Sequence, residues 1–125
     1  AFFGHYPAGS SVKCFMHFFQ MMTNKAFQDF DYGPVENQQR YGQKTPPQVS
    51  IENIRKSGVP IALYVGNSDT IVTTKDSRWA HKALGDAVVD YREVNGGHLQ
   101  FFLTEDASYF TDNAMRMIRK YNPIE

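Results

Sequence analysis

Two apolar runs joined by an amphipathic segment form the most regular pattern of hydrophobic and polar positions in this chain. Residues 59–65 are apolar at nearly every position between Gly58 and Gly66, which is typical of a strand covered on both faces in a parallel sheet. Residues 88–94 predict a second strand. The connection is too long for a hairpin and carries a helical pattern, so a right-handed βαβ crossover is expected.

The helix of this crossover is expected to begin near Thr73 and to end before Gly85. Thr73 is followed three residues later by Asp76, which resembles a capping box, and glycine is common directly after a helix C-terminus. Apolar residues at helical spacing predict one apolar stripe along this helix, formed by Trp79, Ala80, Ala83 and Leu84.

The N-terminal part of the chain is less regular. Residues 1–9 predict a loop, and Ser10 or Ser11 caps a predicted helix that ends near Met22. This helix is apolar on more than one face, so it either packs inside an incomplete fold, which we favour, or contacts lipid. Glycines and prolines spread through residues 24–48 predict an irregular segment, and a loop of that length is usually functional or packed on another part.

Two more helical segments are expected toward the C-terminus. Residues 51–56 predict a short helical turn, and residues 104–121 predict the last helix. Glu105 and Asp106 would lie in the first turn of that helix and basic residues in its last turn, which complements the helix dipole. Its core-facing stripe follows the three-four spacing and is formed by Ala107, Phe110, Ala114, Met117 and Ile118.

Composition narrows the classes of function. Of the 125 residues, 13 are Lys or Arg and 13 are Asp or Glu. The chain therefore carries no excess of positive charge that would favour binding to nucleic acid or to an anionic membrane. The single cysteine, Cys14, excludes an internal disulfide framework and a cysteine-built zinc site, and we expect it to be a buried small residue rather than a nucleophile. No apolar run approaches the roughly 20 residues of a membrane span.

No metal and no cofactor is expected. His5, His17 and His81 share no ligand spacing with one another or with carboxylates, and neither a phosphate loop nor a dinucleotide fingerprint occurs. The sequence has no initiator Met and no basic segment before its first apolar residues. We therefore expect the chain to begin partway through a larger protein, with any targeting signal upstream.

An acid and a histidine follow the two predicted strands. Asp69 ends the turn after the first strand, and His98 follows Asn95-Gly96-Gly97 after the second, 29 residues later. Parallel strands bring their C-terminal ends to one edge, where open α/β sheets hold their chemistry, so we expect the two side chains to meet. There the aspartate would accept the Nδ1 proton of the histidine. Each residue is also common as a structural turn residue, and both interpretations stay open.

The order of these two residues has a counterpart in the α/β-hydrolases, whose triads run Ser, then Asp or Glu, then His. Asp69 and His98 would be the last two members of such a triad. The first member, the serine of a Gly-x-Ser-x-Gly elbow, does not occur in the sequence. The serines that lack this setting are Ser10, Ser11, Ser50, Ser57, Ser68, Ser77 and Ser108.

Several segments resemble one known family. Residues 5–12, His-Tyr-Pro-Ala-Gly-Ser-Ser-Val, resemble the His-x-Pro-Ala-Gly-Thr-Ser-Val segment of the gastric and lysosomal acid lipases. Residues 27–33 resemble the Phe-Gln-Ala-Phe-Asp-Trp-Gly segment of that family. Residues 59–69 resemble its strand ending in Gly-Gly-Asn-Asp, and residues 97–101 its Asn-His-Leu-Asp-Phe segment, with Gln100 in place of the Asp. The resemblance continues in order to the C-terminal helix.

The resemblance implies an α/β fold, namely the C-terminal part of an α/β-hydrolase. Residues 1–50 would be the end of the lipase cap, and residues 51–125 the last parallel strands and helices of the core. It also implies that Asp69 and His98 are the acid and base of a Ser-Asp-His triad in a carboxylic ester hydrolase that acts on triacylglycerols or sterol esters.

By the same resemblance, the nucleophilic serine lies on an N-terminal portion, in a separate chain or a missing segment, which would be the partner of this chain. A lipid ester would be the substrate, and the compartment would be the lysosome or the exterior of the cell. The chain alone is expected to be inactive. The alternative is a non-catalytic, hydrolase-derived structural subunit of a larger assembly.

Overall fold

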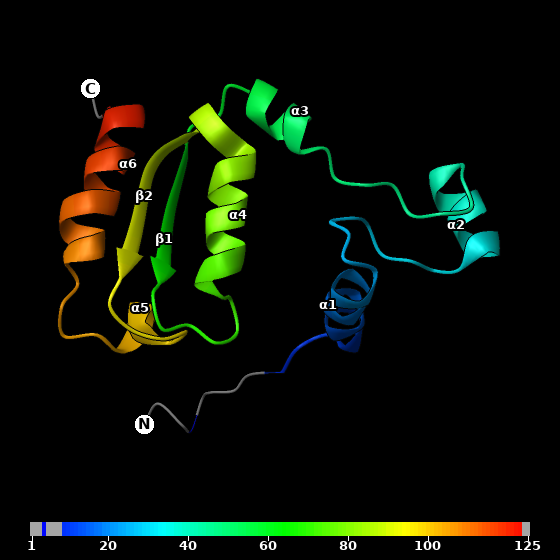
Figure 1. Cartoon of the computed structure of the whole chain (residues 1–125), viewed down its shortest axis with the longest axis horizontal. Coiled ribbons are helices and arrows are strands. Elements are labelled where there is room, and N and C mark those ends of the chain that lie inside the picture. Colours follow the sequence, from blue (N-terminus) through cyan, green and yellow to red (C-terminus); the bar gives the residue numbers. More distant parts are fainter. Residues whose placement is uncertain (1–3, 5–8, 124–125) are drawn as a thin grey trace. The chain divides into compact units, whose positions relative to one another are not determined.

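The computed structural model describes residue 4 and residues 9–123 of the chain. The chain divides into two compact units, Ala1–Val49 and Ser50–Glu125, called here the N-terminal and C-terminal units, and each is considered by itself. Of the loop predicted over residues 1–9, all but residues 4 and 9 lie outside the described residues. Figure 1 shows the order of the elements along the chain.

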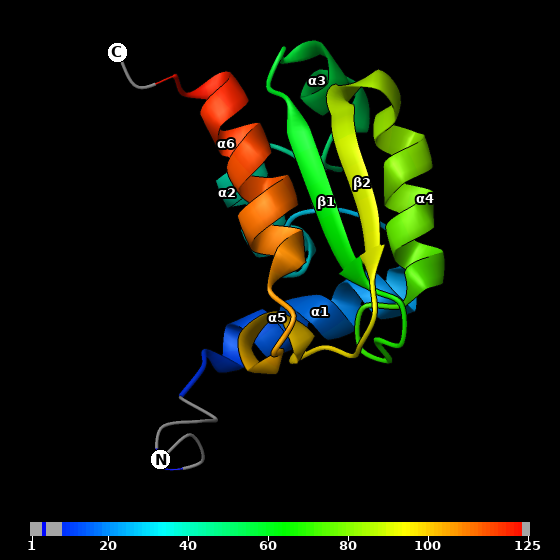
Figure 2. The ribbon, with the colours of Figure 1, turned by 90° about the vertical axis from the view of Figure 1, so that its left-hand side faces the viewer.

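The C-terminal unit contains a two-stranded parallel sheet, formed by β1 (Ile61–Gly66) and β2 (Val88–Val94). The parallel pairing through a helical connection, predicted from the sequence, is confirmed. Strand β1 begins two residues later than predicted, after Pro60, because proline has no N–H to contribute to the ladder. Each residue of 61–65 is half-buried rather than covered on both faces as expected, although α4 and α6 lie on opposite sides of the strands (Figures 1 and 2).

Helix α4 (Thr74–Leu84) connects the two strands and has the predicted ends. The Thr73 side chain accepts a hydrogen bond from the Asp76 N–H, and Gly85 follows the helix with φ 54°. The predicted apolar stripe is partly wrong: Trp79 is 58% exposed, whereas Ser77 is buried. The buried face of this helix therefore passes through a small polar residue.

Side chains on α4 contact β2 through polar and aromatic groups. Nε and Nη2 of Arg78 donate to Glu93, over 2.7 and 2.8 Å, and the Tyr91 hydroxyl also donates to Glu93, over 3.0 Å. The rings of His81 and Tyr91 stack with 4.3 Å between their centroids. An ion pair and a ring stack thus attach this helix to the strand.

The C-terminal segment differs from the single helix predicted over residues 104–121. A short helix, α5 (Gln100–Leu103), is followed by a wide turn of π-helix, η3 (Tyr109–Ala114), and then by α6 (Met115–Tyr121). The acidic residues precede the helix instead of lying in its first turn, and Asp106 accepts a hydrogen bond from the Ser108 N–H over 2.9 Å. The π-turn changes which side chains face the sheet, so Met117 is buried while Phe110 and Ile118 are exposed.

In the N-terminal unit, α1 (Val12–Asn24) follows Ser11 closely as predicted, although no cap hydrogen bond from the Ser11 side chain forms. None of its residues is buried. Cys14 is exposed, which corrects the expectation of a buried thiol. The described residues of this unit do not cover the apolar face of the helix. Five of its apolar side chains are more than half exposed: Val12, Phe15, Phe18, Phe19 and Met22.

Residues 24–48 are not irregular throughout, as was expected. They contain α2 (Pro34–Tyr41), which begins with a proline and is followed by Gly42 at φ 72°. Proline in the first helical position and glycine after the last one are helix boundary signals, so these two residues delimit a helix that the sequence reading missed. Glu36 and Arg40 add an ion pair one helical turn apart.

One buried side chain organises the loop before this helix. Asn37, which is 1% exposed, accepts a hydrogen bond from the Tyr32 N–H and donates to the Asp31 carboxylate over 2.7 Å and to the Lys44 carbonyl over 3.0 Å. The hydrogen bond from Asn37, together with that from the Gly33 N–H, holds the pKa of Asp31 below its ordinary value. The side chain of Asn37 therefore links the loop before α2 to the residues that follow this helix.

Met117→Ala is expected to lower the free energy of unfolding by about 2 kcal/mol, because it deletes the buried part of a core side chain. Ile118→Ala is the matched control: its side chain is 48% exposed, so the change should cost about 0.5 kcal/mol or less. Equilibrium unfolding in urea, followed by far-UV circular dichroism, compares the two. Equal losses would mean that α6 presents a different face to the sheet.

Glu93→Gln is expected to lower stability at neutral pH but not in strong acid. Hydrogen bonds from Arg78 and Tyr91 lower the pKa of Glu93 from 4.5 to about 2. The folded-state pKa is the lower one, so the carboxylate stabilises the fold at pH values above 4.5, and this contribution is lost as the pH falls through about 2. Urea unfolding at several pH values measures the difference between the variant and the unchanged chain.

The matched control is Glu105→Gln, which neutralises an exposed carboxylate outside these contacts and should have little effect at any pH. A deficit of Glu93→Gln that stays the same at all pH values would contradict the assignment of the stabilisation to the carboxylate charge.

Candidate active site

Two turns meet at the C-terminal edge of the sheet. The register pairs Gly66 with Val94, so both strands end together, as the arrowheads in Figure 2 show. The backbone continues the pairing beyond the strands: the Asn67 N–H donates to the Val94 carbonyl over 2.9 Å, and the Ser68 N–H donates to the Gly96 carbonyl over 3.0 Å. The turn that carries the acid therefore lies against the turn that carries the histidine.

The carboxylate of Asp69 accepts hydrogen bonds on both oxygens. Its Oδ1 atom accepts from the N–H groups of Ile71 and Val72, over 2.8 and 2.9 Å. Its Oδ2 atom lies 2.9 Å from Nδ1 of His98. Backbone N–H groups thus orient the carboxylate so that its second oxygen faces the imidazole.

The two side chains differ in exposure. The Asp69 side chain is 6% exposed, whereas that of His98 is 44% exposed. Desolvation alone would raise the pKa of Asp69, but the hydrogen bonds from Val72, His98 and Ile71 outweigh it and hold the pKa below the ordinary value. The acid is therefore ionised at neutral pH, and it accepts the Nδ1 proton of an imidazole whose other edge can reach a reactant.

Glycine is required where the two turns approach. A Cβ on Gly66 would lie 2.7 Å from the Gly96 carbonyl oxygen and 3.1 Å from that of Gly97. Gly96 itself has φ 135°, and the Gln100 side chain lies directly over it. These glycines allow the backbone contact that brings the acid and the histidine together.

The structure brings together the two residues singled out from the sequence, Asp69 and His98, while their catalytic role stays a prediction. Sequence reasoning missed the side chains of Asn67 and Asn95, which join the two turns by a hydrogen bond of 2.7 Å. The sequence feature that could have indicated this bond is the asparagine at the start of each of the two turns. His5 lies outside the described residues, and His17 bonds to the Gln28 carbonyl, away from any acid.

Within the described residues, no group of three or more His, Cys, Asp or Glu side chains is arranged to hold a metal ion. No helix in the described part of the chain is long and apolar enough to cross a membrane.

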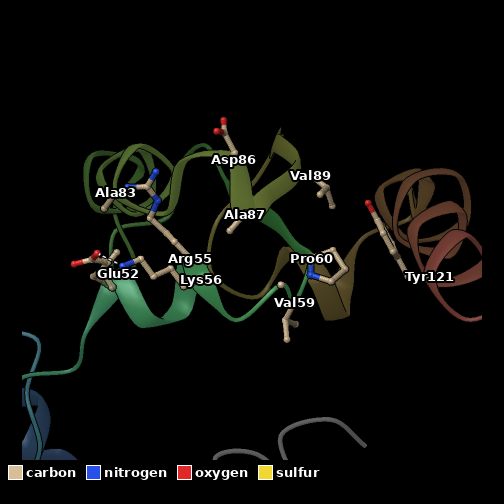
Figure 3. A pocket seen from close by; sticks show the side chains of 12 residues that line it. Glu52, Arg55, Lys56, Val59, Pro60, Ala83, Asp86, Ala87, Val89 and Tyr121 are labelled. Carbon is tan, nitrogen blue, oxygen red and sulfur yellow. Dashed lines mark ion pairs between the residues drawn. The ribbon is translucent and has the colours of Figure 1, made fainter.

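A cavity lies at the other end of the strands. It has a volume of about 950 Å³ and is lined by α3 (Ile51–Lys56), by the residues before β1 and by the end of α6 (Figure 3). Val59, Pro60 and Tyr121 form its apolar side, and Lys56 pairs with Glu52 at its rim. Neither Asp69 nor His98 lines this cavity, so it is not the cleft in which this pair would act.

Gly66→Ala is expected to separate the two turns, because its new methyl group would overlap the backbone of Gly96. Gly97→Ala is the matched control in the facing turn, since its Cβ would meet the Ser68 carbonyl oxygen at an ordinary 3.7 Å. Nuclear magnetic resonance spectra of the His98 ring should change in the first variant and stay close to those of the unchanged chain in the second. Equal spectra in both variants would show that the turns do not depend on this close approach.

Comparison with known proteins gives a consistent set of relatives, although no family model matches the chain. The chain is 31% identical over 115 residues to gastric triacylglycerol lipase of Rattus norvegicus, covering 91% of the chain and 28% of the relative. It is 33% identical over 103 residues to lipase member K of Mus musculus, covering 81% and 25%. With lipase 3 of Drosophila melanogaster it shares 30% identity over 118 residues, covering 92% and 29%.

The chain thus spans between a quarter and three tenths of the length of these relatives, whereas the matches cover most of the chain itself. The relatives agree with the resemblance noted in the sequence. The chain is therefore homologous to the acid lipases, gastric triacylglycerol lipase among them, and corresponds to their C-terminal part.

Proposed function

We propose that this chain supplies the acid and the base of a Ser-Asp-His triad in an acid-lipase-like carboxylic ester hydrolase. The observation that carries the proposal is the 2.9 Å contact between Asp69 and His98 at the C-terminal edge of two parallel strands. The relationship to gastric triacylglycerol lipase supports the same chemistry. The nucleophilic serine would lie on the N-terminal portion of the hydrolase, in a separate chain or in a segment beyond this sequence.

The geometry suits general base catalysis. Nδ1 of His98 faces Asp69, which leaves Nε2 to take the proton of the serine hydroxyl as that oxygen attacks the ester carbonyl. The imidazolium that forms lies against an ionised carboxylate, which stabilises its charge. His98 then returns the proton to the leaving alcohol. In the second half of the reaction a water molecule takes the place of the serine hydroxyl, and the carboxylic acid product is released.

The proposed fold is an α/β-hydrolase. The parallel pair β1 and β2, with helices on both sides, would be the last strands of its core, so that residues 51–125 belong to the core. Residues 1–50 would be the end of the cap that covers the crevice. The exposed apolar side chains of α1 support a position beside an apolar surface of the complete enzyme.

The proposed substrate is a lipid ester, such as a triacylglycerol or a sterol ester. The names of the gastric relatives support a triacylglycerol. On the same relationship the enzyme would act in the lysosome or outside the cell. We infer that this chain alone does not hydrolyse esters, because it contains no elbow serine.

The test is fluorophosphonate labelling of the purified native material, with peptide mapping and intact mass of every chain present. A companion polypeptide with Gly-x-Ser-x-Gly should take the label on its serine. His98→Ala should slow this labelling by about 10²–10⁴-fold, the contribution typical of a general base. His81→Ala is the matched control, because that imidazole stacks on Tyr91 of β2 and makes no hydrogen bond to Asp69 or His98. Its loss should leave labelling nearly unchanged.

The competing hypothesis is a non-catalytic structural subunit derived from a hydrolase. If the companion polypeptides carry no elbow serine and nothing takes the label, this hypothesis replaces the enzyme proposal. Labelling that His98→Ala leaves at full rate would instead show that another base serves the serine, which would remove the proposed role of His98.

A further inference from the structure

Asn67 holds the two turns of the candidate site together through its side chain. Its Nδ2 atom donates to Oδ1 of Asn95 over 2.7 Å, and its Oδ1 atom accepts from the Gly96 N–H over 3.2 Å. The Ser68 hydroxyl also donates to this Oδ1 atom, over 3.1 Å. One amide group on the acid turn therefore makes two hydrogen bonds to the histidine turn.

The orientation of this amide is determined by its partners. A backbone N–H can only donate, so the atom of Asn67 that faces Gly96 must be the oxygen. The nitrogen then faces Asn95, whose side-chain oxygen accepts its proton. An asparagine is suited to this position because donor and acceptor lie side by side on one planar group.

The two members of the dyad are positioned differently. Asp69 is held within its own turn by the N–H groups of Ile71 and Val72. In the described residues, the one hydrogen bond of the His98 ring is that to Asp69. The location of the imidazole therefore depends on the turn that precedes it, and that turn is attached to the acid turn through the Asn67 side chain and the Ser68 N–H.

We infer that Asn67 is a positioning residue, which sets the separation of the two turns so that Asp69 receives the Nδ1 proton of His98. This inference rests on the proposed function in naming the imidazole as a catalytic base, but its geometric content stands on these contacts alone. Asn67 would touch neither the substrate nor the reacting atoms. It would act by selecting the imidazole tautomer that leaves Nε2 able to accept a proton.

The test is the tautomer of His98, measured by the ¹⁵N chemical shifts of its ring at a pH where the imidazole is neutral. In the unchanged 125-residue chain, hydrogen bonding to Asp69 should favour the Nδ1–H form. Asn67→Ala removes both side-chain links between the turns, so this preference should be lost and the ring should shift toward the Nε2–H form of a free imidazole. The backbone amide signals of β1 and β2 report whether the fold is retained.

Two further variants separate positioning from folding. Ser68→Ala is the matched control: it removes a hydroxyl that bonds to Asn67 without linking the turns, so the tautomer should stay as in the unchanged chain. Asn95→Ala should weaken the preference, and Asn95→Asp should restore it, because the aspartate retains the oxygen that accepts from Asn67. If Asn67→Ala fails to fold, the two Asn95 variants test the positioning role.

Two results would overturn the inference. One is a folded Asn67→Ala chain, or an Asn95→Ala chain, with an unchanged His98 tautomer. The other is an equal change in Asn67→Ala and Ser68→Ala, which would indicate a general loosening of the turn. A failed labelling experiment combined with the expected tautomer shift would contradict the proposed hydrolase function but leave the positioning role of Asn67 in place.

Discussion

Parallel pairing of β1 with β2 is the constraint on which the candidate site depends. The pairing of Gly66 with Val94 makes both strands end at the same level, so the next few residues of each must run side by side. An antiparallel pair would place the two turns at opposite ends of the sheet. The parallel register converts two residues far apart in sequence into neighbours joined by a 2.9 Å hydrogen bond.

Polar contacts are prominent in the C-terminal unit. Among the described residues, Met117 is the one buried apolar side chain, whereas many large apolar side chains are exposed. Polar contacts such as the pairing of Arg78 with Glu93 attach the flanking helices to the strands. Apolar surface of this extent is usually covered by protein or lipid, which agrees with the proposal that the chain works as one portion of a larger hydrolase.

The errors of prediction have local physical causes. Proline and glycine around residues 34–42 predict irregular structure, whereas Pro34 begins a helix and Gly42 follows its end. Asp106 accepts a hydrogen bond from the Ser108 N–H before the last helix instead of lying inside its first turn. Trp79 fitted the apolar periodicity of α4, yet it is exposed, because periodicity identifies a stripe without identifying the surface that covers it.

The two strands, their helical connection, and the positions of Asp69 and His98 directly after the strands could be predicted from the sequence, because these features follow from local patterns and chain topology. Features that depend on distant partners could not be predicted: the half-buried state of the strands, the close backbone approach at Gly66, and the Asn67 side-chain bonds between the turns. Hydrogen bonds between side chains have no periodicity along a sequence, so their partners become visible once the chain has folded.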